Sequence, residues 1–233
     1  MDMERYSVVE QKNRREIVLL RGRGCVYKRC TFCDYHLDKS PDDEANFALN
    51  AQVLSHVTGQ YGDLEVINSG SVFELDDATL DLIRQTCLER GIHTLHFEAH
   101  WLFRKRIPEL RRRFAPLTLK MKLGLESFDY DLRENVLDKG IAEADPALIA
   151  QGFDEANFLV GIAGQTVEGL RRDFELGLSL FERICVNVMC ANTTPVVPDQ
   201  QVISAFMAQL YPALEADPRA DVLLNNTDFG VGA

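Results

Sequence analysis

Apolar strand-like runs alternate with amphipathic segments along this 233-residue chain, and this alternation constrains its fold most. Strands are expected over 16–22, 64–70, 93–100, 117–127, 156–164, 184–194 and 222–226. Helices are expected over 44–61, 75–90, 105–114, 129–139, 167–183 and 199–215, the last with a kink at Pro212. Repeated strand–helix–strand units predict a parallel sheet. Six units are fewer than the eight of a closed barrel, so we expect an α/β fold, a partial (βα)6 TIM-like barrel, in a single domain over residues 1–233.

The composition predicts a cytoplasmic protein with no membrane partner. No apolar run approaches the roughly 20 residues that span a bilayer, and the polar N-terminus lacks the apolar segment of a secretory signal. In the cytoplasm the six cysteines would stay reduced. The formal net charge is −11, from 25 Lys and Arg against 36 Asp and Glu. An acidic chain binds long nucleic acids poorly, because cations drive that binding, so nucleic acid is not an expected partner.

Three cysteines lie within nine residues, directly after the first expected strand, in the stretch GCVYKRCTFCDYH. Cys25, Cys30 and Cys33 have the spacing C-x4-C-x2-C. Three thiolates on one loop can hold three irons of a [4Fe–4S] cluster and leave the fourth iron open. Two alternatives remain: a zinc ion with His36 as a fourth ligand, and plain packing of small apolar side chains. Cys87, Cys185 and Cys190 are scattered along the chain and are expected to pack in the core.

Alternation within the strands predicts which side chains face the inside of the barrel. Helices should cover the apolar faces, and the polar faces then point inward. The inward side chains on 93–100 and 117–127 would be His96, Glu98, His100, Lys120, Lys122 and Glu126. A buried lysine needs a partner: one of the glutamates, a cofactor carboxylate or a substrate phosphate. Each histidine could contact a ligand or be a core residue. Asn187 on 184–194 should face the same cavity.

The cysteine stretch resembles the cluster loop of the radical S-adenosylmethionine (radical SAM) enzymes, whose usual pattern is C-x3-C-x-aromatic-C. Thr31-Phe32-Cys33 keeps the last part of that pattern, and one extra residue separates Cys25 from Cys30. Three further pieces resemble family segments that follow strands, namely Asn68-Ser69-Gly70-Ser71, Gly124-Leu125-Glu126-Ser127 and Gly161-Ile162-Ala163-Gly164-Gln165-Thr166. Four such pieces in the family's order, over roughly residues 16–200, make the resemblance specific.

The resemblance implies a fold of the radical SAM type, with a [4Fe–4S] cluster on Cys25, Cys30 and Cys33 and SAM as cofactor. One electron to the cluster would cleave SAM to a 5′-deoxyadenosyl radical, which removes a hydrogen atom from the substrate. An electron donor such as flavodoxin or ferredoxin would be the protein partner. The residues expected at SAM are Phe32, Asn68, Ser69, Gly70, Ser71, Glu98, Glu126, Ser127, Gly161 and Gly164. Among these, Phe32 would pack near the adenine, or shield the cluster, or both.

A small-molecule substrate, such as a nucleoside or nucleotide, is expected, because the chain carries neither an appended RNA-binding barrel nor a second cysteine set. No residue is assigned a catalytic role. The candidate substrate contacts are His96, His100, Lys120, Lys122, Asn187 and Asp228. Asp228 could read a guanine-like edge, or lie in a frayed terminus. The basic segment 105–114 could be a nucleic-acid patch or a solvated helix face. An enzyme acting on RNA or on a protein side chain, and a zinc protein without activity, are the competing hypotheses.

Overall fold

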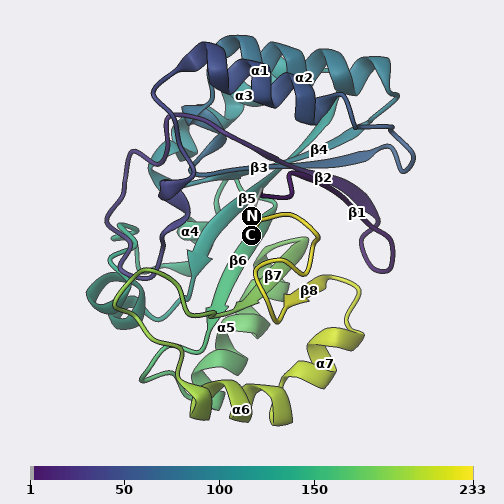
Figure 1. Ribbon diagram of the computed structural model, residues 1–233. Helices are drawn as coiled ribbons and strands as arrows, with labels where there is room; N and C mark the ends of the chain where they lie inside the picture. Colours follow the sequence, from purple (N-terminus) through teal and green to yellow (C-terminus); the bar gives the residue numbers. More distant parts are fainter. Residues whose placement is uncertain (1–2, 233) are drawn as a thin grey trace. The chain divides into compact units, whose positions relative to one another are not determined.

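A computed structural model of the protein describes residues 3–232 (Figure 1). The chain divides into two compact units. The first holds residues up to 28, 35–121 and those from 229, and the second holds Arg29–Asp34 and Lys122–Asp228. A single domain can contain two compact units, so the expected single domain over 1–233 stays a prediction.

The first unit contains β1 (Tyr6–Val9), β2 (Arg15–Leu20), β3 (Asp63–Asn68), β4 (Thr94–Ala99) and the start of β5 (Thr118–Glu126). β1 is antiparallel to β2, and β2, β3 and β4 are parallel in sequence order. The helices α1 (Asp43–Leu54), α2 (Asp77–Glu89) and α3 (Ile107–Phe114) follow the parallel strands and lie together on one face of them (Figure 1). The loops between strands and helices contain three 3-10 turns, η1 (Tyr35–Leu37), η2 (Val72–Glu74) and η3 (Trp101–Arg106).

Three details of the first unit differ from the expected elements. β1 was not predicted, because four half-buried residues give little alternation. α1 ends at Leu54 rather than near 61, because the chain then turns through Gly59 and Gly62, which have φ of +80° and +68°. The basic segment is not one helix: a 3-10 turn ends at Arg106, and α3 begins at Ile107.

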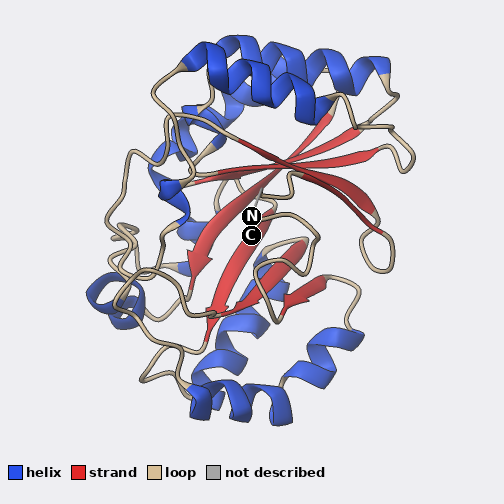
Figure 2. Cartoon of the chain, in the orientation of Figure 1, coloured by secondary structure: helices blue, strands red, loops and turns tan. Residues whose placement is uncertain are grey.

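The second unit contains the end of β5 and the strands β6 (Glu155–Val160), β7 (Arg183–Val188) and β8 (Ala220–Leu223), all parallel and in sequence order. The helices α4 (Pro146–Ala150), α5 (Val167–Leu180), α6 (Gln200–Gln209) and α7 (Tyr211–Ala216) complete it (Figure 2). The helix expected over 129–139 is only a π-helical turn, η4 (Asp131–Val136). The kink expected at Pro212 is confirmed as the break between α6 and α7.

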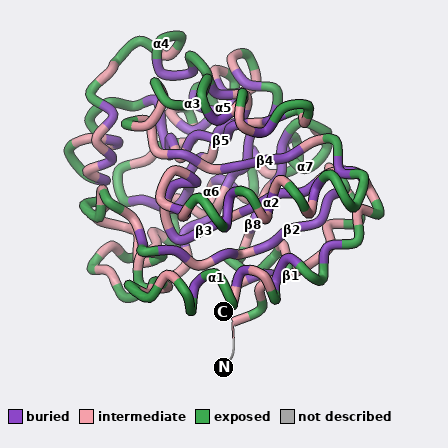
Figure 3. Tube along the Cα trace, turned by 90° about the horizontal axis from the view of Figure 1, so that it is seen from above, coloured by how far each residue is buried: buried purple, intermediate pink, exposed green. Residues whose placement is uncertain are grey.

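The parallel strands of each unit are buried over most of their length (Figure 3). The predicted faces of β5 are confirmed on the apolar side, where Leu119, Met121, Leu123 and Leu125 are at most 3% exposed. Charged side chains are also buried, and they form ion pairs within each unit. Glu155 and Arg183 are 2.8 Å apart and Arg183 and Asp221 3.4 Å apart in the second unit, and Arg15 pairs with Glu65 in the first.

Among residues 3–232, no helix is long and apolar enough to cross a membrane.

Candidate cluster and SAM site

The first part of the cysteine loop belongs to the first unit, where Glu74 and His100 contact it. The carboxylate of Glu74 accepts a hydrogen bond from the backbone N–H of Val26. The ring of Tyr27 stacks on His100 with centroids 4.6 Å apart. His100 also accepts a hydrogen bond of 3.2 Å from the Leu102 N–H, which caps η3. These contacts give His100 a structural role, and its contact with a substrate stays a prediction.

The turn Asn68–Ser71 follows β3 and is closed by its own hydrogen bonds. Asn68 Nδ2 donates to the Ser71 carbonyl at 3.1 Å, and the Gly70 N–H donates to the Asn68 carbonyl at 2.7 Å. Ser69 Oγ donates to Asp38 at 3.1 Å. Within residues 3–232, Asn68 Oδ1 and Ser71 Oγ are buried without a hydrogen-bond partner. Buried polar atoms rarely stay unpaired, so these two fit a polar ligand such as the methionine part of SAM.

The second part of the cysteine loop, Arg29–Asp34, belongs to the second unit, where η4 and the segment after β7 anchor it. Thr31 donates to the carbonyls of Leu137 and Val136 at 3.1 and 2.7 Å. Asn192 Nδ2 donates to the Phe32 carbonyl at 2.7 Å. The Phe32 ring packs against an apolar cluster formed by Leu137, Leu159, Ile162 and Met189. Phe32 is therefore part of the packing in this unit, and its contact with the adenine or the cluster stays a prediction.

A buried ion pair lies beside this segment. Glu126 ends β5 with φ of +71°, after a bulge between Gly124 and Glu126, and its Oε1 is 2.7 Å from Lys139 Nζ. The same nitrogen lies 5.5 Å from the centre of the Phe32 ring. Burial disfavours the charge on Lys139, but the carboxylate of Glu126 and the thiols of Cys30 and Cys33 outweigh it and hold the pKa of Lys139 above its usual range. Sequence reasoning missed Lys139, because no strand or helix periodicity marks it.

Ser127 is fully buried, and its hydroxyl donates to Asp173 on α5 at 2.6 Å. The N–H of Phe128 donates to the other oxygen of the same carboxyl at 3.1 Å. Burial raises the pKa of Asp173 to about 6, against these hydrogen bonds, which lower it. Asp173 thus fixes the chain after β5, and Ser127 and Gly164 line one pocket of about 310 Å³ in this unit.

The turn after β6 has glycines at the two positions that need a left-handed backbone. Gly161 and Gly164 have φ of +101° and +93°, where other residues are strained. Gln165 holds the turn: its Oε1 accepts from the N–H groups of Gly161 and Ile162, both at 2.9 Å, and its Nε2 donates to the Leu159 carbonyl at 2.7 Å. Three hydrogen bonds from one side chain therefore hold the two glycines of this turn in place.

The other predicted site residues lie on the polar strand faces, except Asp228, which lies in the turn after β8, and several have protein partners. His96 Nε2 is 3.0 Å from Asp63 Oδ1. Asp228 accepts hydrogen bonds from the N–H groups of Leu224 and Asn225 at 2.7 and 2.8 Å. It therefore closes a turn and does not lie in a frayed end. Lys122 is 2% exposed and lies beside Glu155 in the sheet register. Glu98, Lys120 and Asn187 are half-buried. Their contacts with SAM or substrate stay predictions.

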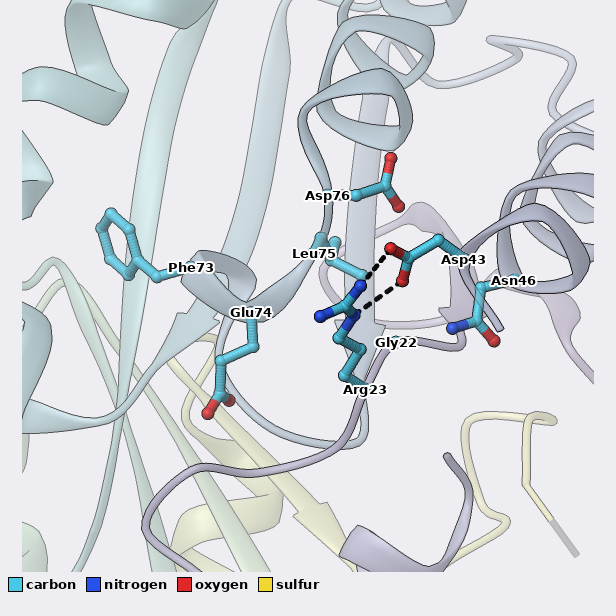
Figure 4. Close-up of a pocket in the computed structure, with 8 residues that line it drawn as sticks. All are labelled: Gly22, Arg23, Asp43, Asn46, Phe73, Glu74, Leu75 and Asp76. Carbon is cyan, nitrogen blue, oxygen red and sulfur yellow. Dashed lines mark hydrogen bonds and ion pairs between the residues drawn. The ribbon is translucent and has the colours of Figure 1, made fainter. Parts of the chain in front are cut away.

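A second pocket, of about 210 Å³, lies in the first unit at the ends of β2 and β3 (Figure 4). Arg23 forms an ion pair with Asp43 there, with Nε 2.7 Å from Oδ1. The carboxylate of Glu74 points away from this pair in Figure 4 and accepts its hydrogen bond from the cysteine loop. None of the residues that line this pocket is predicted to contact SAM. One of them, Glu74, is hydrogen-bonded to Ser71 in the turn Asn68–Ser71.

The three loop cysteines are half-buried and form no disulfide among residues 3–232, which suits a cluster that must be both shielded and reducible. Cys25 belongs to the first unit, and Cys30 and Cys33 to the second. Within residues 3–232, no three side chains of His, Cys, Asp or Glu are gathered closely enough to hold a metal ion. Three reduced thiols on one loop fit a [4Fe–4S] cluster in their chemistry, and their role as its ligands stays a prediction.

The βα order, the cysteine loop and the turns after β3, β5 and β6 together define the class of protein. The chain belongs to the radical SAM enzymes, and its fold is the partial (βα)6 barrel of that family, as predicted. Within the family, one solved structure that the chain resembles is queuine lyase from Clostridium spiroforme bound to SAM and queuine. The two are 42% identical over 100% of both chains, with a TM-score of 0.95.

A structure of SuiB from Streptococcus suis has a TM-score of 0.57 and 13% identity, and the match covers 88% of this chain and 48% of that one. At this identity the likeness shows the fold alone. No protein-family model matches the chain, and no curated protein matches it significantly.

Proposed function

We propose that this protein is a radical SAM lyase that releases queuine from queuosine or queuosine 5′-phosphate, in queuosine salvage. The observation that carries the proposal is the 42% identity, over the full length of both chains, to queuine lyase bound to SAM and queuine. The length of the chain and the four-residue gap between its first two cysteines also resemble that enzyme. A small nucleotide substrate agrees with the acidic net charge of −11, which disfavours tRNA.

Cys25, Cys30 and Cys33 would hold the [4Fe–4S] cluster, and SAM would bind at its open iron. When bound, cluster and SAM together supply a 5′-deoxyadenosyl radical, which takes a hydrogen atom from the substrate's ribose so that the glycosidic bond breaks. An electron donor such as flavodoxin or ferredoxin would reduce the enzyme in the cytoplasm. The protein supplies binding, orientation and exclusion of water.

The residues around the cysteine loop have the chemistry to bind SAM. The unpaired oxygens of Asn68 and Ser71 can accept hydrogen bonds from an ammonium group. The Lys139–Glu126 pair offers a buried cation and anion beside Phe32, and the charged ends of the methionine part need such partners. Glu98 would accept from the ribose hydroxyls, and Gly161 and Gly164 would leave room for the adenine.

Substrate binding would use the polar strand faces. Lys120 or Lys122 would bind the 5′-phosphate, because an ammonium group is a common phosphate ligand. His96, His100 and Asn187 are further candidates from the same faces. Asp228 would read the deazaguanine edge with its remaining acceptor sites, because one oxygen of its carboxylate already accepts two backbone N–H groups.

The test is an anaerobic reaction of the iron-reconstituted protein with dithionite, SAM and queuosine 5′-phosphate, analysed for free queuine by mass spectrometry. We expect queuine from the wild type and none from Cys30→Ser, with Cys190→Ser as the matched cysteine control that retains activity. Reconstituted protein that makes 5′-deoxyadenosine but leaves queuosine and its 5′-phosphate intact would refute the substrate. Colourless protein with zinc would refute the cluster.

A further inference from the structure

Glu74 connects two segments of the first unit that are far apart in the sequence. Its Oε1 accepts from the N–H of Val26, next to Cys25, and its Oε2 accepts from the N–H of Ser71 at 2.5 Å. The Glu74 N–H in turn donates to the Ser71 carbonyl at 2.8 Å. One carboxylate therefore joins the cysteine loop to the turn after β3. The contact with Ser71 is that of an S-x-x-E capping box, whereas no sequence motif indicates the contact with Val26, which spans 48 residues.

The two segments also touch directly at Gly70. A Cβ atom on Gly70 would lie 3.2 Å from Cys25 Cα and 3.3 Å from Cys25 N, and it would overlap Glu74 Oε2. Such contacts are closer than packed side chains tolerate. Gly70 is thus required by the close approach of the two backbones, and the bridging carboxylate lies beside this contact.

Only a carboxylate of this length satisfies both segments. An ionised carboxylate offers two acceptor oxygens, whereas an amide offers one oxygen and an NH2 group that would face a second N–H donor. Aspartate is one methylene shorter. Burial raises the pKa of Glu74 above its ordinary value, and the hydrogen bonds from the two backbone N–H groups offset only part of that rise.

We propose that Glu74 is a positioning residue that fixes Cys25 against the Asn68–Ser71 turn. This rests on the proposed function, in which Cys25 binds the cluster and the turn binds SAM. By joining the two, Glu74 would set the distance between the first cluster ligand and the amino-acid end of SAM. It touches neither, and it acts through the backbone of both segments.

The experiment compares the wild type with Glu74→Gln, and with Asp43→Asn as a control that alters a carboxylate lining the same pocket. Hydrogen exchange of the protein without cluster reports the bridge itself. We expect faster exchange by about tenfold or more at the Val26 and Ser71 amides in Glu74→Gln, since loss of a charged hydrogen bond is worth that much. Asp43→Asn should leave both amides unchanged.

The second readout is SAM itself, with reconstituted protein, dithionite and no substrate. We expect Glu74→Gln to bind iron like the wild type and to show a KM for SAM raised about tenfold or more, with Asp43→Asn within about twofold. Glu74→Asp, which keeps the charge, should fall between Gln and wild type and serves if the Gln variant fails to fold.

Unchanged exchange at both amides in the folded variants would overturn the bridge. Faster exchange with an unchanged KM for SAM would overturn its positioning role. These outcomes are separate from failure of the proposed substrate, because neither readout needs queuosine. Wild-type protein without iron or SAM cleavage would refute the proposed function and, with it, this role of Glu74.

Discussion

Replacing Lys139 by methionine should destabilise the protein strongly. The Lys139 and Glu126 side chains are only 10% and 9% exposed, and their charged atoms lie 2.7 Å apart. Methionine fills a similar volume but leaves the carboxylate buried without its cation. Removing one partner of a buried ion pair costs about 3–5 kcal/mol, because the remaining charge stays desolvated. We expect a loss of this size in the free energy of unfolding, measured by urea titration with circular dichroism at neutral pH.

Arg29→Met is the matched control, because Arg29 forms an ion pair of nearly the same length, 2.8 Å, with Asp138. Those side chains are 64% and 41% exposed, and exposed pairs contribute about 0–1 kcal/mol. The double variant Lys139→Met/Glu126→Leu should recover part of the loss, because it removes the isolated charge as well. Equal costs for Lys139→Met and Arg29→Met, or no recovery in the double variant, would refute the reasoning.

Further predictions concern a buried acid, a phenol and a glycine. Burial raises the pKa of Asp173 from 3.8 to about 6, so its stabilisation is complete below about pH 4 and is lost as pH rises through 6. Relative to Asp173→Asn, the wild type should lose on the order of 3 kcal/mol between pH 4 and 7 in urea titrations, and a gain would contradict the burial argument. Burial, aided by a glutamate, raises the pKa of Tyr6 to about 12. Tyr6→Phe should therefore remove an absorbance titration near pH 12, and loss of one near pH 10 would count against it. Gly161→Ala should lower the melting temperature more than Gly152→Ala, because both have positive φ but only the first Cβ meets a neighbour, at 2.9 Å; equal effects would exclude the contact.

The fold could be predicted because its signal is local. Alternation in β5 placed Leu119 and Leu123 on the covered face, and both are buried. The misses are equally local in cause. β1 has four residues and no buried face, and the segment after Glu126 is held by tertiary contacts rather than by a helical repeat. There Arg133, fully buried, donates to the carbonyls of Ser127 and Glu143.

The candidate site could be predicted only where residues lie in motifs. The spacing of the cysteines predicts the cysteine loop, and runs of small residues after strands predict the three turns. The partner of Glu126 could not be predicted from the sequence, because Lys120 and Lys122 share its strand. The bulge before Glu126 and its positive φ direct the carboxylate to Lys139 instead. The role of Glu74 could not be predicted for a similar reason, because it depends on a hydrogen bond with Val26, which is 48 residues away in the sequence.

The most direct test of the proposed function measures whether deuterium moves from the substrate's ribose to 5′-deoxyadenosine. Reduced, iron-reconstituted protein would be given SAM and queuosine 5′-phosphate deuterated on the ribose, and both 5′-deoxyadenosine and queuine would be analysed by mass spectrometry. We expect deuterium in 5′-deoxyadenosine together with free queuine. Release of queuine with unlabelled 5′-deoxyadenosine, or of neither product in the presence of an intact cluster, would contradict it.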